Sequence, residues 1–198
     1  RLIRSNLDVS CIGVTHEYYD TKTNNTQNLD NIYIDDIGDG GSKTDKYERD
    51  IKLLLKGIED EPNNTRYHFY LSQSYKDSGD VSNAIKWYTK TLDLNGWIQE
   101  KYYSCLMLGD LYLQQGKLDQ AQVQLEYVLD LSPEYSNARW FLSSVFEQKE
   151  DLESAIEQIQ FVLIENPENE LIISRLERLQ AGLVSEEVVE PLEDEIIE

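Results

Sequence analysis

The sequence predicts a mainly α-helical protein, an α-α superhelix of antiparallel helix pairs that follows a short β-containing segment. Apolar residues recur at helical spacing in paired segments, on either side of short breaks such as residues 115–117. Pro133 and Pro167 lie 34 positions apart, and each follows a second helix that it cannot continue. Small residues recur 12 positions apart in three pairs: Ser72 and Ala84, Gly109 and Ala121, Ser143 and Ala155.

Each pair of small residues has a packing cause. Only small side chains allow two antiparallel helices to approach closely where they cross. The clearest unit spans residues 102–133, with Leu108-Gly109-x-x-Tyr112 in its first half, then Ala121 and Leu125 before the proline. This pattern resembles the 34-residue tetratricopeptide repeat (TPR). The resemblance implies a TPR solenoid that binds proteins or peptides.

The repeats predict the domain organisation of residues 42–182. A half-repeat at residues 44–61 carries the apolar stripe of one helix and ends at Pro62. Three repeats follow at residues 65–97, 102–133 and 136–167, and a capping helix at residues 168–182 covers the last apolar face. Gly182 is expected to stop that helix. Residues 183–198 are strongly acidic and are predicted to form a disordered tail, either solubilising or partner-binding.

Two departures from the repeat pattern are informative. Leu71 and Leu108 lie 37 positions apart instead of 34, which places three extra residues around Gly96 and Trp97. Trp97 is expected to pack across the junction that follows the first repeat. In the third repeat Glu150 replaces the turn glycine, so we expect a weaker and more mobile turn there.

Residues 1–41 do not follow the repeat pattern. Strand-like segments occur at residues 2–4, 9–14 and 31–35, with a polar loop at residues 20–31 and a glycine-rich break at residues 39–42. So few short strands can scarcely fold alone. They need the solenoid, or a larger sheet, to pack against.

This first segment carries a second resemblance. Arg1-Leu2-Ile3-Arg4 and the element Gly13-x-x-His16-Glu17 resemble the end of the catalytic domain of family 2 glycosyltransferases, and the likeness runs into the repeats as far as residue 112. It implies that His16 and Glu17 lie at the edge of a sugar-nucleotide site, in a parent protein that uses a divalent metal and a nucleotide sugar. Imidazole and carboxylate suit a divalent metal. The alternative is an ordinary strand-end pair that faces solvent.

The chain lacks the rest of such an enzyme. No Asp-x-Asp occurs, and no β-α-β stretch precedes His16. We therefore expect no catalysis and no cofactor in this chain by itself. Two functions stay open: a TPR interaction scaffold that is the C-terminal portion of a family 2 glycosyltransferase, or a stand-alone TPR adaptor.

Charge and composition exclude other classes. With 18 Lys and Arg against 38 Asp and Glu, the formal net charge is -20, so nucleic acid and anionic membranes should be repelled. No apolar run approaches the roughly 18 residues of a membrane span, and no signal peptide is visible. Cys11 and Cys105 form neither a disulfide framework nor a zinc motif, and Cys105 is expected to be buried. The default location is the cytoplasm.

The first helix of each repeat should line a partner-binding groove on the concave face. The positions that would bind Lys, Asn and Arg in a chaperone-type carboxylate clamp hold Phe69, Gln73, Asn137 and Phe141, so the clamp is absent. The groove is instead expected to offer an apolar stripe to a helical or extended segment. The alternative is that several of these residues pack against neighbouring repeats. The candidate groove residues are Arg66, Phe69, Gln73, Lys76, Tyr103, Leu106, Asp110, Leu113, Asn137, Trp140, Ser144 and Glu147.

Overall fold

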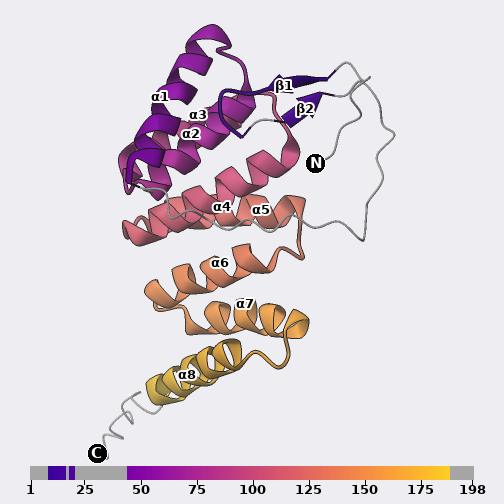
Figure 1. The fold of residues 1–198 in the computed structure, drawn as a ribbon. Coiled ribbons are helices and arrows are strands. Elements are labelled where there is room, and N and C mark those ends of the chain that lie inside the picture. The colour runs from indigo at the N-terminus through magenta and orange to yellow at the C-terminus, as the bar shows by residue number, and fades with distance from the viewer. Residues whose placement is uncertain (1–8, 17, 21–43, 188–198) are drawn as a thin grey trace, which may run out of the picture. The chain divides into compact units, whose positions relative to one another are not determined.

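The computed structural model describes residues 9–16, 18–20 and 44–187 (Figure 1). The chain is mainly helical after a short β-hairpin, which confirms the predicted fold class. The predicted strands at residues 2–4 and 31–35 lie outside the described residues. The elements are β1 (Ser10–Ile12), β2 (Tyr18–Asp20), α1 (Thr44–Asp60), α2 (Thr65–Asp77), α3 (Val81–Asp93), α4 (Ile98–Gln114), α5 (Leu118–Leu131), α6 (Ser136–Gln148), α7 (Leu152–Glu165) and α8 (Glu170–Glu187).

The chain divides into two compact units, Arg1–Glu100 and Lys101–Glu198. The boundary lies near the start of α4, and not at residue 41 where the composition changes. The first unit therefore contains the hairpin together with α1, α2 and α3. The second contains most of α4 and the four helices that follow.

In the first unit, the hairpin is an antiparallel pair in which Cys11 lies opposite Tyr19. The strand at Ser10–Ile12 falls inside the predicted segment 9–14, whereas β2 was not predicted from the sequence. Leu54, Leu71 and Trp87, from α1, α2 and α3, share one buried cluster. Val14, directly after β1, packs against the same cluster. The hairpin thus joins the core of the first helices, as the lack of a self-sufficient sheet predicted.

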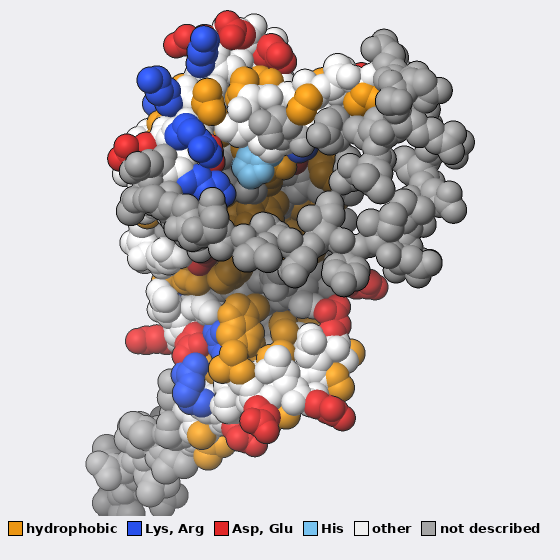
Figure 2. Space-filling model, viewed as in Figure 1, with side chains coloured by type: hydrophobic (Ala, Val, Ile, Leu, Met, Phe, Trp, Pro, Cys, Tyr) orange, Lys and Arg blue, Asp and Glu red, His pale blue; other side chains and the backbone are white. Residues whose placement is uncertain are grey.

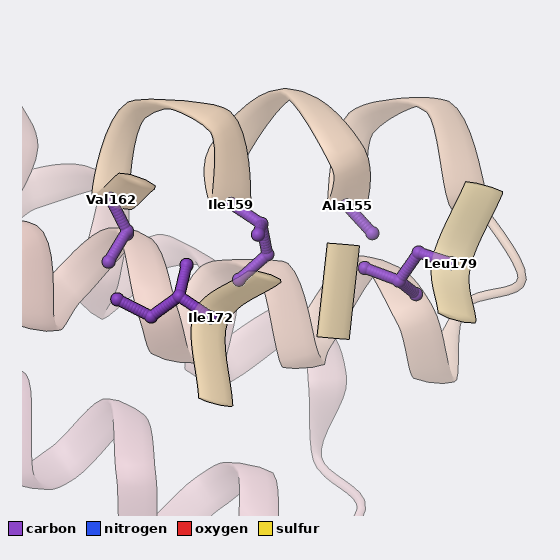
Figure 3. Close-up of a cluster of buried hydrophobic side chains, with 5 residues drawn as sticks. All are labelled: Ala155, Ile159, Val162, Ile172 and Leu179. Atoms are coloured by element: carbon purple, nitrogen blue, oxygen red, sulfur yellow. The ribbon is translucent and has the colours of Figure 1, made fainter. Parts of the chain in front are cut away.

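In the second unit, the last helix pair closes around a cluster of aliphatic side chains. Ala155, Ile159 and Val162 of α7 face Ile172 and Leu179 of α8, and all five are buried (Figure 3). This contact covers the apolar side of α7, as the predicted capping helix should. The helix itself is longer than predicted, since α8 continues through Gly182 to Glu187. A glycine inside a helix costs about 1 kcal/mol, which packing against neighbouring helices readily offsets.

The small-residue pairs lie where the sequence predicted close helix contact. Ser72, Ala84, Ala121, Ser143 and Ala155 are all fully buried. At Gly109 of α4, a Cβ would lie only 2.6 Å from Cγ of Leu125 in α5. The absence of a side chain at this position is therefore what allows α4 and α5 to cross so closely.

The turns between the paired helices share one backbone geometry. Gly79 and Gly116 have positive φ values of 85° and 69°, and Glu150 takes the same place in the third turn with φ of 64°. Glutamate carries a Cβ that disfavours this left-handed region. The substitution that the sequence identified is therefore a strained residue in an otherwise conserved turn geometry.

Two single residues were also predicted from the pattern. Cys105 is 1% exposed, as expected of a thiol among apolar helical neighbours, and burial raises its pKa to about 11. Trp97, in contrast, is 62% exposed, so the expected packing of its ring was wrong. The close contact in this turn is made by Gly96, whose Cβ position lies 2.7 Å from Thr65.

Candidate partner-binding face

The predicted groove residues lie on α2, α4 and α6, the first helices of the three pairs. Phe69, Leu106 and Leu113 are buried and contribute to the core. Asn137 is exposed. The remaining residues are half-buried, which suits a surface that is partly covered by its own chain: Arg66, Gln73, Lys76, Tyr103, Asp110, Trp140, Ser144 and Glu147.

In the first unit, the hairpin covers the start of this surface. Arg66 of α2 donates a hydrogen bond from Nη2 to the carbonyl oxygen of His16 at 3.2 Å. Its guanidinium carbon lies 4.9 Å from the ring centroid of Tyr70 and 5.3 Å from that of Tyr18. Arg66 also approaches the buried carboxylate of Glu100 at 4.0 Å. It is therefore a joint between the hairpin and the helices, with little capacity left for a partner.

The surroundings of Glu100 show the cost of that joint. Burial raises the pKa of its carboxyl group, and the nearby Arg66 guanidinium only partly offsets the rise. A carboxylate that has left water is stabilised by charged neighbours and hydrogen bonds. Arg66 thus has a structural role in the first unit that the repeat pattern alone does not reveal.

In the second unit, Arg175 of α8 organises the same side of α6. Its guanidinium carbon lies 4.4 Å from the centroid of the Trp140 ring. Nη2 donates hydrogen bonds to Ser144 Oγ at 2.8 Å and to Glu147 Oε2 at 3.2 Å. Arg178 donates to the other oxygen of Glu147 at 2.5 Å. The structure thus brings together three of the four predicted residues of the third repeat, through a helix that was not assigned to the site.

We call this set the α6–α8 face: Trp140, Ser144, Glu147, Arg175 and Arg178. The hydrogen bond from Arg178, together with both guanidinium charges, lowers the pKa of the Glu147 carboxyl group, so it is ionised at neutral pH. The side chain of Arg175 is 11% exposed and that of Arg178 is 60% exposed. Figure 2 shows hydrophobic side chains over this part of the second unit with basic side chains beside them.

The sequence contained a signal for this role of α8. From the amphipathic pattern alone, Arg175 and Arg178 belong to the solvent side of a cap. However, α8 begins at Glu170, 34 positions after the start of α6 at Ser136. It therefore occupies the place of the first helix of a further repeat, and a shift of 34 from Ser144 gives Arg178. The repeat period, applied once more, would have found it.

The pair His16 and Glu17 is only partly described, because Glu17 lies outside the described residues. His16 has a positive φ of 51°, and its ring stacks on Tyr70 with centroids 3.9 Å apart and an interplanar angle of 7°. Among the described residues, no group of three or more His, Cys, Asp or Glu side chains is placed to hold a metal ion. A single stacked imidazole is not a ligand set, so no catalytic step can be built on a metal here.

Other comparisons bear on the fold. Across the described part of the chain, none of the helices is both long and apolar enough to cross a membrane. Residues 106–170 match the family profile named Tetratricopeptide repeat. No curated protein sequence matches the chain.

Solved structures extend the match beyond those residues. A crystal structure of MamA superimposes with a TM-score of 0.64 at 22% identity, covering 76% of this chain and 86% of that one. MamA from Desulfovibrio magneticus RS-1 gives 0.64 at 20% identity, covering 72% of this chain and 78% of that one. YrrB, described as a TPR protein with an unusual peptide-binding site, gives 0.58 at 18% identity and 66% coverage of each chain. At these identities the likeness establishes the fold, which is of the tetratricopeptide type.

Proposed function

We propose that this chain is a TPR scaffold that binds a protein or peptide through the first helices of its repeats, with the α6–α8 face as the principal contact. The observation that carries the proposal is the contact of Arg175 with Trp140, Ser144 and Glu147. These bonds fix the indole and a guanidinium in one place before any partner arrives. Preorganised aromatic and Arg side chains are the residues that most often dominate binding energy.

The chemistry of the face narrows the partner. Two guanidinium groups face one ionised carboxylate, so the face carries a local positive charge in a chain whose net charge is -20. Trp140 and the buried Leu106 and Leu113 beneath the helices favour an apolar anchor. The partner that fits is a peptide with a large apolar side chain near an acidic one.

A peptide selection tests this proposal directly. A random peptide library displayed on phage is panned on the purified chain, and recovered peptides are measured by fluorescence anisotropy. We expect Arg178→Ala to weaken binding about tenfold or more, because a charged hydrogen-bond donor is lost from the interface. Trp140→Ala should weaken it further.

The matched control is Ile164→Ser on α7, where the side chain is 75% exposed and outside the face. Arg178 is largely exposed, so its variant should fold normally even if Trp140→Ala does not. Peptides that bind both Arg178→Ala and the parent chain equally, but lose affinity for Ile164→Ser, would overturn the assignment.

A second candidate function places this chain at the C-terminal end of a family 2 glycosyltransferase, with His16 and Glu17 near its sugar-nucleotide site. It rests on the Arg1–Arg4 and Gly13–Glu17 patterns, supported by the contacts of His16 with Tyr70 and Arg66, which tie that element to the first repeat. The coding sequence upstream of Arg1 is the test. An open frame for an α/β domain with Asp-x-Asp supports the transferase, whereas a start codon directly before Arg1 leaves the stand-alone adaptor.

We also propose a reducing, cytoplasmic location. Cys11 is exposed and Cys105 is buried, and both are free. Thiol titration of the denatured chain, purified without reductant, should give two free thiols. A dimer linked through Cys11 would contradict the proposal.

A further inference from the structure

The first unit contains an open cleft between the end of β1 and the start of α1. Its volume is about 450 Å³, within the range of small-molecule sites. One wall is the segment from Val14 to His16, and the other is one face of α1, with Lys46, Arg49, Asp50 and Leu53 at helical spacing. The cleft lies away from the α6–α8 face in sequence and belongs to a different unit.

Positive charge is concentrated beside this cleft. Lys46 and Arg49 line it, and α1 continues with Lys52 and Lys56, so this one helix carries 4 of the 18 basic residues of the chain. All four are exposed. Figure 2 shows Lys and Arg side chains gathered on the α1 side of the first unit, next to a histidine. In a chain with a net charge of -20, such a cluster raises the local concentration of anions.

Thr15 supplies an independent indication of a ligand. It lines the cleft, is only 8% exposed, and its Oγ1 has no hydrogen-bond partner in the described part of the chain. A buried hydroxyl without a partner is costly, and such groups are rare in folded proteins. A ligand oxygen in the cleft would satisfy it.

Asp50 sets the strength of the site. It is 6% exposed, and its Oδ1 lies 3.3 Å from Nη2 of Arg49. This pairing holds the guanidinium at the cleft wall and also places one negative charge there. An incoming anion must compete with Asp50 for Arg49, so the site should be weak and should respond strongly to loss of that carboxylate.

We propose that this cleft binds a phosphate group, with the Thr15 hydroxyl, the Lys46 ammonium and the Arg49 guanidinium as its donors. Three donors on two different walls fit the several oxygens of a tetrahedral anion better than the two of a planar carboxylate. Guanidinium and ammonium groups together match the charge of a phosphate at neutral pH. His16 borders the cleft, but its ring lies against Tyr70 and is not needed as a donor.

The test is a titration of the full chain with inorganic phosphate, followed residue by residue in nitrogen–proton NMR spectra at constant ionic strength. We expect saturable shifts at Thr15, Lys46 and Arg49, with much smaller shifts when acetate or chloride replaces phosphate. Lys46→Gln and Arg49→Gln should each weaken phosphate binding about tenfold, because each removes a charged donor. Asp50→Asn should tighten it.

Matched controls separate a site from general attraction to a basic helix. Lys52→Gln and Lys56→Gln remove the same charge from α1 outside the cleft and should leave the affinity within about twofold. Thr15→Ser keeps the hydroxyl and should retain binding, whereas Thr15→Val should lose it. Equal weakening by Lys46→Gln and Lys52→Gln, or unsaturable shifts that acetate reproduces, would overturn the proposal.

Discussion

Arg175 of α8 lies over the indole of Trp140 in α6, with its guanidinium carbon 4.4 Å from the ring centroid. The two residues are 35 positions apart in sequence, close to one repeat period. Their contact makes α8 part of the repeat series as well as the cap of the last apolar face. It also explains why the third repeat presents an ordered polar surface.

Arg175 should contribute to stability more than its neighbour Arg178. Arg175→Met should lower the free energy of unfolding by about 1–3 kcal/mol, since it removes a partly buried ion pair and a cation–π contact and leaves Glu147 with less compensation. Arg178→Met should cost only about 0–1 kcal/mol, because that side chain is 60% exposed. Urea unfolding measures both. Equal losses would show that the burial of Arg175 is not what matters.

Glu150 should be replaceable by glycine with a gain in stability. Its φ of 64° lies in the left-handed region, where Gly79 and Gly116 occupy the equivalent turns. Because the Cβ costs roughly 1–2 kcal/mol there, and glycine loses part of that gain through its freer unfolded state, we expect Glu150→Gly to stabilise by about 0.5–1 kcal/mol. Thermal unfolding is the measurement, with Gly116→Glu as the reverse change. A lower melting temperature for Glu150→Gly would contradict this.

Gly109 should not tolerate even one methyl group. The new Cβ would lie 2.6 Å from Cγ of the buried Leu125, so α4 and α5 would have to separate. We expect Gly109→Ala to destabilise by about 1–2 kcal/mol, after the gain in helix propensity is subtracted. The control is Gly182→Ala in α8, where the nearest atom is the end of a leucine side chain at 3.2 Å. A more stable Gly109→Ala than Gly182→Ala would disprove the close crossing.

His68 should make the first unit sensitive to mild acid. It is buried, its Nε2 lies 2.9 Å from the carbonyl oxygen of Pro62, and its edge faces Trp87. Burial lowers its pKa below the ordinary 6.5, with a hydrogen bond to Pro62 opposing and Lys90 adding to the shift. Below pH 6.5 the unfolded chain therefore binds more protons than the folded one. Stability should be fully present above pH 6.5 and fall as the pH drops toward the lower folded pKa.

The measurement is the free energy of unfolding between pH 5.5 and 7.5, in the parent chain and in His68→Gln. Carboxylates titrate mainly below this window, so the decline should largely disappear in the variant. The same slope in both proteins would assign the acid sensitivity to other groups.

The sequence predicted those features that recur. Ser72, Ala84, Ser143 and Ala155 are buried because their 12-residue spacing reflects helix crossings, and the prolines place the ends of the second helices. A feature that occurs once leaves no such pattern. The bond from Arg66 to the His16 carbonyl joins residues 50 positions apart, and no periodicity predicts it.

The candidate site shows the same division. Repeat positions identified Trp140, Ser144 and Glu147, which do share one surface. They also included Phe69, Leu106 and Leu113, which are buried, because a first-helix position can face a neighbouring helix as well as a partner. Which of the two occurs depends on side-chain packing between elements, and amphipathic spacing alone does not decide it.

The central claim is that the α6–α8 face binds a partner, and one affinity comparison tests it most directly. A peptide selected on the parent chain is titrated against the parent, Arg178→Ala and Ile164→Ser, with folding of each verified by circular dichroism. The account predicts a loss of about tenfold or more for Arg178→Ala and no change for Ile164→Ser. Unchanged affinity for Arg178→Ala, with a loss for Ile164→Ser, would place the binding surface on the outer helices and contradict it.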